Sequence, residues 1–206
     1  MNTNKLSLRD MKREATAAAL ADAAFELARE RGMDGFVVED VVQKAQFSRR
    51  TFANHFSCKE EAVATAAVTF ENANEAEDLI AGLPADADPV DVLHRLLKLQ
   101  LIGDHLWKMH ELMSLSKRHP TLEPYVLSAF RRLQTAAEET VSEFSRGRYP
   151  ESYPHMLAGA VYGAILPLLD GSLNVLLPGQ SADGQSDAAT FDDYLETMFG
   201  CLRKGF

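Results

Sequence analysis

Apolar residues recur every three or four positions along almost the whole 206-residue chain, and that spacing is typical of amphipathic helices. The clearest series is Leu122, Val126, Phe130, Leu133, Ala137, Val141 and Phe144. No segment alternates apolar and polar residues in the way that predicts a half-buried strand. The periodicity therefore predicts an all-α fold.

Glycine and proline divide the pattern into separate helices. We expect helices over residues 10–31, 38–45, 49–56, 57–78, 89–103, 104–118, 121–146, 152–177 and 191–202. Pro167 predicts a kink in the long apolar helix, and residues 178–186 read as a loop. The longest uncharged run, residues 156–169, is shorter than the roughly 18–20 residues that span a bilayer. We therefore expect no membrane association.

The charge is divided unevenly along the chain, whose net charge is −9. Residues 1–59 carry ten basic and eight acidic side chains, a net +2, whereas residues 60–206 carry eleven and twenty-two, a net −11. A locally basic segment can bind a polyanion even in an acidic protein, because binding depends on the local field. The two cysteines, Cys58 and Cys201, are far apart. They exclude a disulfide scaffold and fit a reducing cytoplasm.

Residues 38–56 have the spacing of a helix-turn-helix: two short helical segments joined by Gln46-Phe47-Ser48. Phe52 and Phe56 lie four apart and are expected to face inward. The outward face then carries Arg49, Arg50, Thr51, Asn54 and His55. Such side chains suit phosphates and base edges in the DNA major groove. The alternative is a short helical pair within a generic bundle.

The motifs around this segment resemble the DNA-binding domain of TetR-family transcriptional regulators. The matching residues are Glu30-Arg31-Gly32, Val38-Glu39-Asp40-Val41-Val42, Ala45-Gln46-Phe47-Ser48, Thr51-Phe52-Ala53-Asn54-His55-Phe56 and Lys59-Glu60-Glu61. The resemblance implies a helix-turn-helix domain over residues 1–58 and a helical effector-binding and dimerisation domain over 59–206. The DNA-contacting residues are then expected to be Lys44, Gln46, Ser48, Arg49, Arg50, Thr51, Asn54, His55 and Lys59, with Arg9 and Lys12 on phosphates.

The chain departs from the family pattern at several positions. Gln46 stands where a turn glycine is usual, Ala53 replaces the usual tyrosine, Cys58 occupies a usual serine or asparagine cap position, and Val37 a common threonine. The sequence of residues 49–63 also resembles that of an actinobacterial subgroup of the family, some members of which sense acyl-CoA-like ligands. A small apolar or amphipathic effector of that kind is therefore expected.

The C-terminal part supplies candidates for the effector site and the dimer interface. The ligand candidates are Leu101, His105, Trp107, His110, Met113, Phe130, Met156 and Tyr162, which would line an apolar pocket with a few polar contacts. The interface candidates are Leu157, Val161, Phe191, Leu195, Met198 and Leu202. Ordinary core packing within one subunit is the alternative for both sets.

No catalytic, cofactor-binding or metal-binding motif is found in the sequence. His105 and His110 lie five apart, which does not place them on one helix face as a metal pair. We therefore expect a cytoplasmic, ligand-responsive regulator, a repressor that binds a palindromic operator as a homodimer. The alternatives are an all-α small-molecule-binding or interaction protein that no longer binds DNA, and an all-α enzyme.

Overall fold

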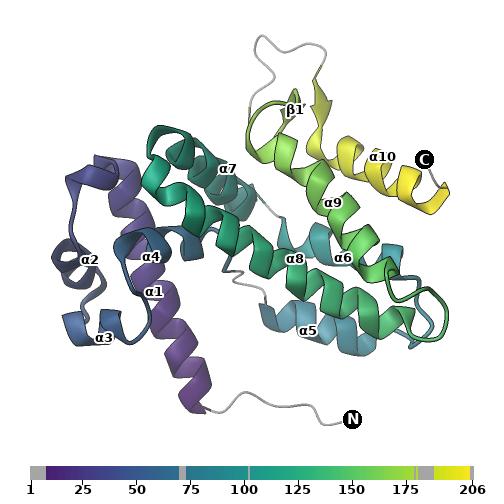
Figure 1. Cartoon of the computed structure of the whole chain (residues 1–206), viewed down its shortest axis with the longest axis horizontal. Helices are drawn as coiled ribbons and strands as arrows, with labels where there is room; N and C mark the ends of the chain where they lie inside the picture. Colours follow the sequence, from purple (N-terminus) through teal and green to yellow (C-terminus); the bar gives the residue numbers. More distant parts are fainter. Residues whose placement is uncertain (1–7, 70–72, 102, 179, 181–187, 205–206) are drawn as a thin grey trace. The chain divides into compact units, whose positions relative to one another are not determined.

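The computed structural model describes residues 8–69, 73–101, 103–178, 180 and 188–204, and within these ranges the chain is almost entirely helical (Figure 1). The helices of its first part are α1 (Leu8–Arg31), η1 (Met33–Gly35), α2 (Val38–Ala45), α3 (Arg49–Ala53) and α4 (Lys59–Ala66). Those that follow are α5 (Ala73–Gly82), α6 (Pro89–Gln100), α7 (Gly103–Arg118), η2 (Pro120–Leu122), α8 (Glu123–Ser145), α9 (Tyr153–Leu169) and α10 (Phe191–Lys204). The expected all-α class is confirmed.

The chain divides into two compact units. Unit 1 comprises Met1–Thr69 and Ser114–Ala129, and unit 2 comprises Phe70–Met113 and Phe130–Phe206. The expected domain boundary at residue 58 lies directly before α4. The structure groups α4 with unit 1, because α4 packs along α1 and against η2.

Unit 1 is built on α1, which contacts both α2 and α4. Leu20, Ala24 and Leu27 of α1 are buried, as the three-and-four spacing of its apolar residues requires. Val41 of α2 and Val63 of α4 are also fully buried. This packing holds the short helices α2 and α3, which are too short to be stable alone.

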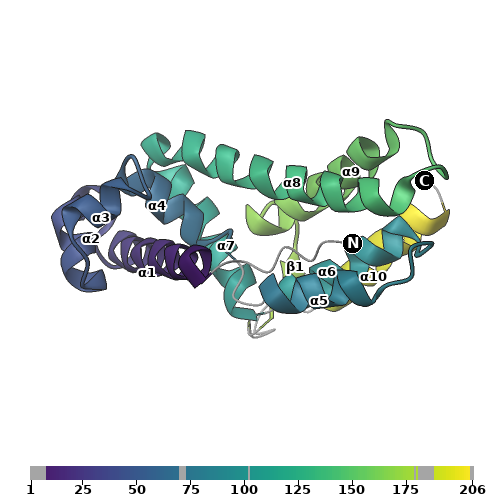
Figure 2. The same ribbon diagram turned by 90° about the horizontal axis from the view of Figure 1, so that it is seen from below.

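Unit 2 brings α5 and α6 together as neighbours (Figure 2). Ala76, Val92, Leu96 and Phe144 form one buried cluster from α5, α6 and α8. On α6, His94 stacks on Phe199 of α10 with ring centroids 4.3 Å apart. Arg203 of α10 donates to Asp91 of α6 at 2.9 Å, so polar contacts also join these two helices.

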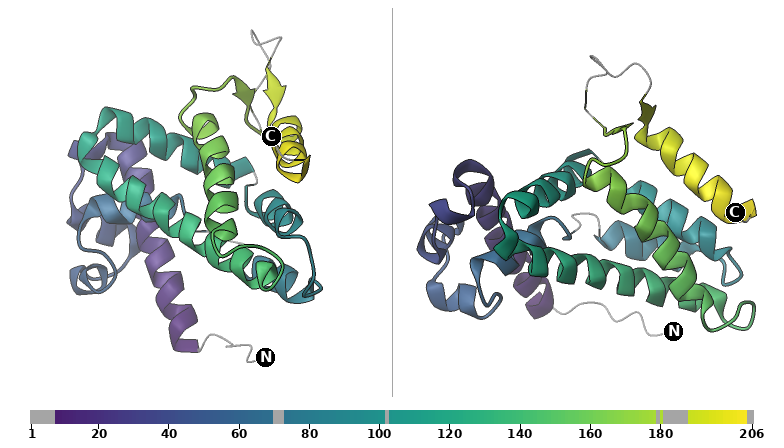
Figure 3. Two further views of the ribbon diagram at one scale, coloured as in Figure 1. Left: turned by 45° about the vertical axis from the view of Figure 1, so that its right-hand side comes forward. Right: turned by 45° about the horizontal axis from the view of Figure 1, so that its top comes forward.

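Strands were not expected, but two of two residues each, β1 (Val175–Leu176) and β2 (Ala189–Thr190), pair in parallel before α10 (Figure 3). The helix expected over residues 152–177 ends at Leu169. Gly171 follows with a left-handed φ of 74°, a conformation that commonly ends helices. Pro167, expected to kink the C-terminal half of the longer helix, therefore lies in the last turn of α9.

The apolar stripe expected at a dimer interface lies inside the chain. Leu157, Val161, Phe191, Leu195 and Met198 are all buried, with at most 9% of each exposed, and Leu202 is half-buried. The expectation that they meet a second subunit is therefore wrong for the five buried residues. The apolar face of α10 has found a partner in α6 of the same chain.

Within the described ranges, none of the helices combines the length and the apolar character that a bilayer crossing requires.

Candidate nucleic-acid interface and ligand cavity

The turn between α2 and α3 forms without glycine. Gln46 adopts φ 59° and ψ 37°, and among the described residues it is the only non-glycine with a positive φ. Its N–H donates to the Gln43 carbonyl at 3.3 Å, and the Phe47 N–H donates to the Val42 carbonyl at 2.9 Å. These bonds close the turn with a side chain in the left-handed region, which costs about 1–2 kcal/mol in a residue with a Cβ.

The second helix of the motif is capped by its own side chains. The Thr51 N–H donates to Ser48 Oγ at 3.0 Å, as an N-cap serine does. The two hydroxyls also lie 2.8 Å apart and hydrogen-bond each other. Both expected DNA-contacting hydroxyls therefore also position the start of α3.

The inward side of residues 49–56 is apolar, as expected, although α3 itself ends at Ala53 and a backbone hydrogen bond from Phe56 N–H to the Phe52 carbonyl continues the turn. Phe52 and Phe56 are 3% and 6% exposed, and their ring centroids lie 5.6 Å apart. Arg49, Arg50 and Asn54 are exposed on the other side. The prediction that residues 49–55 present polar side chains outward is met by these three.

Two of the expected cations are engaged within unit 1. Lys59 donates from Nζ to the carbonyls of Met33 and Phe36, which fastens the start of α4 to η1 and the residue after it. Lys44 Nζ lies 2.8 Å from Glu26 Oε2. Its hydrogen bond with this carboxylate raises the pKa of Lys44. The Lys59 charge is thus used to build the domain.

A basic groove lies between α1 and the end of α3. It is lined by Arg9, Asp10, Lys12, Arg13, Thr16, Asn54 and His55. Positions 9, 12, 13 and 16 share one face of a helix, so the sequence signal for this surface was present. Arg13 was nonetheless missed, because only tertiary packing brings that face of α1 to Asn54 and His55.

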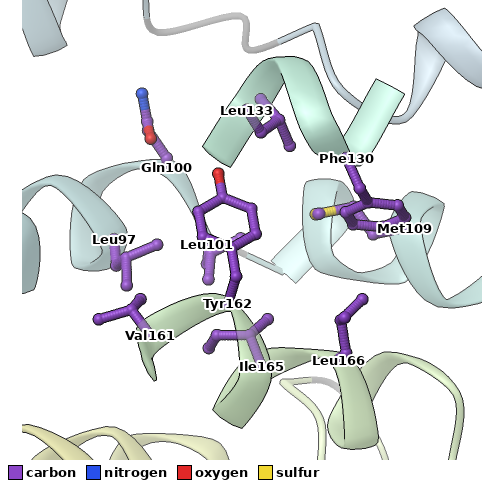
Figure 4. Close-up of a pocket in the computed structure, with 10 residues that line it drawn as sticks. All are labelled: Leu97, Gln100, Leu101, Met109, Phe130, Leu133, Val161, Tyr162, Ile165 and Leu166. Atoms are coloured by element: carbon purple, nitrogen blue, oxygen red, sulfur yellow. The ribbon is translucent and has the colours of Figure 1, made fainter. Parts of the chain in front are cut away.

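The C-terminal unit contains a small apolar cavity (Figure 4). Its lining residues come from α6, the residue after it, α7, α8 and α9: Leu97, Gln100, Leu101, Met109, Phe130, Leu133, Val161, Tyr162, Ile165 and Leu166. Tyr162 points from α9 into the middle of this set (Figure 4). Burial raises the pKa of Tyr162 far above its ordinary value, so its phenol stays neutral. The cavity holds only about 30 Å³.

The comparison with known families agrees with the geometry of unit 1. Residues 20–65, from the middle of α1 to α4, match the family model for bacterial regulatory proteins of the tetR family. This part of the chain is a TetR-family N-terminal domain.

One solved structure extends the likeness of fold beyond that domain, and a second is similar at a lower score. A crystal structure assigned to the TetR family, from Mesorhizobium loti MAFF303099, has a TM-score of 0.50 and 18% identity, covering 92% of this chain and 97% of that one. A TetR/AcrR-family regulator from Thermobifida fusca YX-ER1 has a TM-score of 0.47 and 16% identity, covering 93% of this chain and 98% of that one. None of the curated proteins matches the chain. The Mesorhizobium structure supports a TetR-like fold.

Only some of the residues expected to bind a ligand line this cavity. Leu101, Phe130 and Tyr162 line the cavity. Trp107 and Met156 are 41% and 58% exposed instead, and they are not among its lining residues.

The two histidines of that set, and Met113, also lie outside the cavity lining. His110 Nδ1 is 2.9 Å from the Leu169 carbonyl. Burial lowers the pKa of His105 to about 4, and the Lys108 charge adds to the effect. His105 is therefore a neutral side chain at physiological pH. In the described part of the TetR-like chain, no three histidine, cysteine or acidic side chains are grouped as a metal site.

Proposed function

We propose that the protein is a ligand-responsive transcriptional regulator, a repressor that binds a palindromic operator as a homodimer and releases it when a small effector binds. The observation that carries the proposal is the exposed polar face of α3 beside the basic groove on α1. DNA as the partner implies action in the cytoplasm of a bacterial cell.

The proposed contacts divide into base reading and phosphate binding. Arg49 and Arg50 would read guanine and Asn54 adenine, the pairings that their donor and acceptor groups favour. Arg9, Lys12 and Arg13 would bind the phosphate backbone, which fixes the position of the protein but reads no sequence.

The remaining DNA candidates lie around this core of contacts. His55 lines the groove, whereas Gln46 and Lys44 flank the turn. Ser48 and Thr51 would act mainly by holding α3 in place through their mutual hydrogen bond. Lys59 is not one of the proposed DNA contacts, because its ammonium group donates hydrogen bonds to the backbone carbonyls of Met33 and Phe36.

We propose a dimer interface on a different face from the expected one, which combined Leu157 and Val161 of α9 with the apolar stripe of α10. Met156 and Leu166 of α9 are 58% and 37% exposed. Between them, a Cβ built on Gly159 or Gly163 would meet nothing within 4 Å. Positions 156, 159, 163 and 166 share one face of α9. A second copy packed on this face would bury its apolar residues, and the two glycines would allow close helix approach.

The proposal is tested by binding to duplex DNA. Random duplexes are selected through rounds of binding to the full chain, and the enriched sequence is titrated at several salt concentrations. We expect a palindromic site, and a steep loss of affinity with salt. Arg50→Ala should weaken binding by about 5- to 150-fold, from the roughly 1–3 kcal/mol of one bidentate base contact.

Arg132→Ala is the matched control, because Arg132 is an exposed arginine of α8 in the other unit. This variant should bind like the parent chain. Failure to enrich any sequence would favour an all-α binding protein without DNA contact. Equal loss of affinity in both arginine variants would show that α3 is not the reading helix.

A further inference from the structure

An open groove in unit 2 adjoins the small cavity of Figure 4. It lies among α5, α6, α8 and α9 and has a volume of about 760 Å³. Leu97, Gln100, Leu133, Val161 and Tyr162 line both spaces. Ligand pockets typically measure about 300–1,000 Å³. The groove therefore has the size of a small-molecule site, and the cavity is its closed apolar end.

The wall that α6 and α9 give to the groove is mostly apolar. Leu93, Leu96 and Leu97 come from α6, and Val161 and Tyr162 from α9. On α8 the groove is bordered by small side chains, Ala136 and Ala137, which leave room that a larger residue would fill. An apolar ligand body is favoured here because it would remove this surface from water.

The charges that line the groove have predominantly one sign. Three exposed carboxylates, Glu77 of α5 with Glu139 and Glu143 of α8, line the groove together with one cation, Arg146. Their sum is −2. Glu139 and Glu143 lie one helical turn apart, where like charges repel and destabilise a helix. A cation bound beside them would relieve that repulsion.

We infer that this groove binds a small organic cation with an apolar body. The body lies against Leu97 and Tyr162, and the positive charge lies near Glu139 and Glu143. The neutral Tyr162 ring adds a surface on which a cation is stabilised. A polyphosphorylated acyl-CoA-like ligand is disfavoured, because the carboxylates would repel its phosphates. The inference names the effector class of the proposed regulator, and so rests on that function for its biological meaning.

The test uses two ions of nearly the same shape and opposite charge, tetraphenylphosphonium and tetraphenylborate. Each is titrated calorimetrically into the full chain at low and at high salt. We expect the cation to bind at least tenfold more tightly than the anion at low salt. The preference should shrink at high salt, because ions screen exposed charges. Equal binding, tighter binding of the anion, or binding of neither ion would overturn the inference.

Variants locate the site. The double variant Glu139→Gln with Glu143→Gln should bind the cation about tenfold more weakly and should not lose affinity for the anion. Glu75→Gln is the matched control, since Glu75 is an exposed acid of α5 that does not line the groove. Ala137→Trp fills the groove and should also weaken binding of the cation. Weaker cation binding by the control, or unchanged cation binding by both groove variants, would contradict this placement of the site.

The same preparations are assayed with the selected DNA. If the chain binds DNA but does not prefer the cation to the anion, the inferred cationic effector is wrong and the proposed regulatory function stands. A chain that prefers the cation but binds no DNA supports the groove and overturns the regulator.

Discussion

The first arginine of α3 is paired with an acid of α2: Arg49 Nη1 lies 2.6 Å from Glu39 Oε1. Both side chains are more than half exposed, at 76% and 56%, so the pair is accessible to DNA. A phosphate or a guanine would compete with Glu39 for the same guanidinium. In the proposed complex with DNA, Glu39 would therefore oppose binding by holding Arg49 and by its own negative charge.

Replacing Glu39 should tighten binding to DNA. Glu39→Gln frees Arg49 and removes a carboxylate near the phosphates, so we expect about a two- to fivefold gain in affinity, the scale of an exposed ion pair. Titration of the selected duplex measures it. Glu123→Gln, an exposed acid at the start of α8, is the control and should change nothing. Weaker binding by Glu39→Gln would mean that Glu39 positions Arg49 productively.

The left-handed residue of the turn predicts a stabilising substitution. Gln46 has φ 59°, a conformation that glycine adopts at little cost. Gln46→Gly should raise the free energy of unfolding by about 0.5–1 kcal/mol. Gln43→Gly, within α2, should lower it by about as much, because glycine weakens a helix interior. Urea denaturation measures both, and a loss of stability in both variants would contradict the assigned turn.

His105 predicts a pH dependence of stability. Burial lowers its pKa from 6.5 to about 4 in the folded chain. As the pH falls below about 6.5 the unfolded chain takes up a proton first, so stability is full above that pH and is lost toward pH 4. The loss is about 2–3 kcal/mol.

The measurement compares urea denaturation at pH 7.5 and at pH 4.5. His105→Gln should be less sensitive to this change of pH than the parent chain. His55→Gln, in the groove beside α1 of the other unit, should keep the sensitivity of the parent. Identical pH profiles for parent and His105→Gln would show that His105 carries no buried-imidazole effect.

A charge should have different effects at an exposed position of α9 and at a buried position of α10. Met156→Glu places a carboxylate on the exposed face of α9, away from the residues that line the cavity, and should give a folded monomer. Leu195→Asp buries a charge at a position that is 0% exposed, so it should unfold unit 2. Sedimentation and far-ultraviolet circular dichroism separate these outcomes. Leu127→Glu, at a 63% exposed position of α8, is the control. A dimer that survives Met156→Glu would refute the proposed interface on α9.

Short-range spacing was enough to predict much of unit 1. The four-residue interval between Phe52 and Phe56 predicted both rings inward, and the structure keeps this spacing through one helical hydrogen bond from Phe56 N–H to the Phe52 carbonyl, although α3 ends at Ala53. The turn at Gln46 and the start of α3 at Ser48 were likewise predictable from local motifs. These features depend on neighbours within a few residues, which a sequence displays directly.

The sequence does not show which surface covers the apolar face of a helix. The spacing of Leu195 and Met198 showed that α10 buries one side, but an amphipathic helix carries no mark of which surface covers it. Packing against α6 decided it. In the same way, the charges of Lys44 and Lys59 were visible while their partners Glu26 and Met33 were not. The sequence by itself determined helix content, the turn and the inward face of α3; only the tertiary structure decided which helices share a core, because contacts between distant residues depend on the packing of the whole unit.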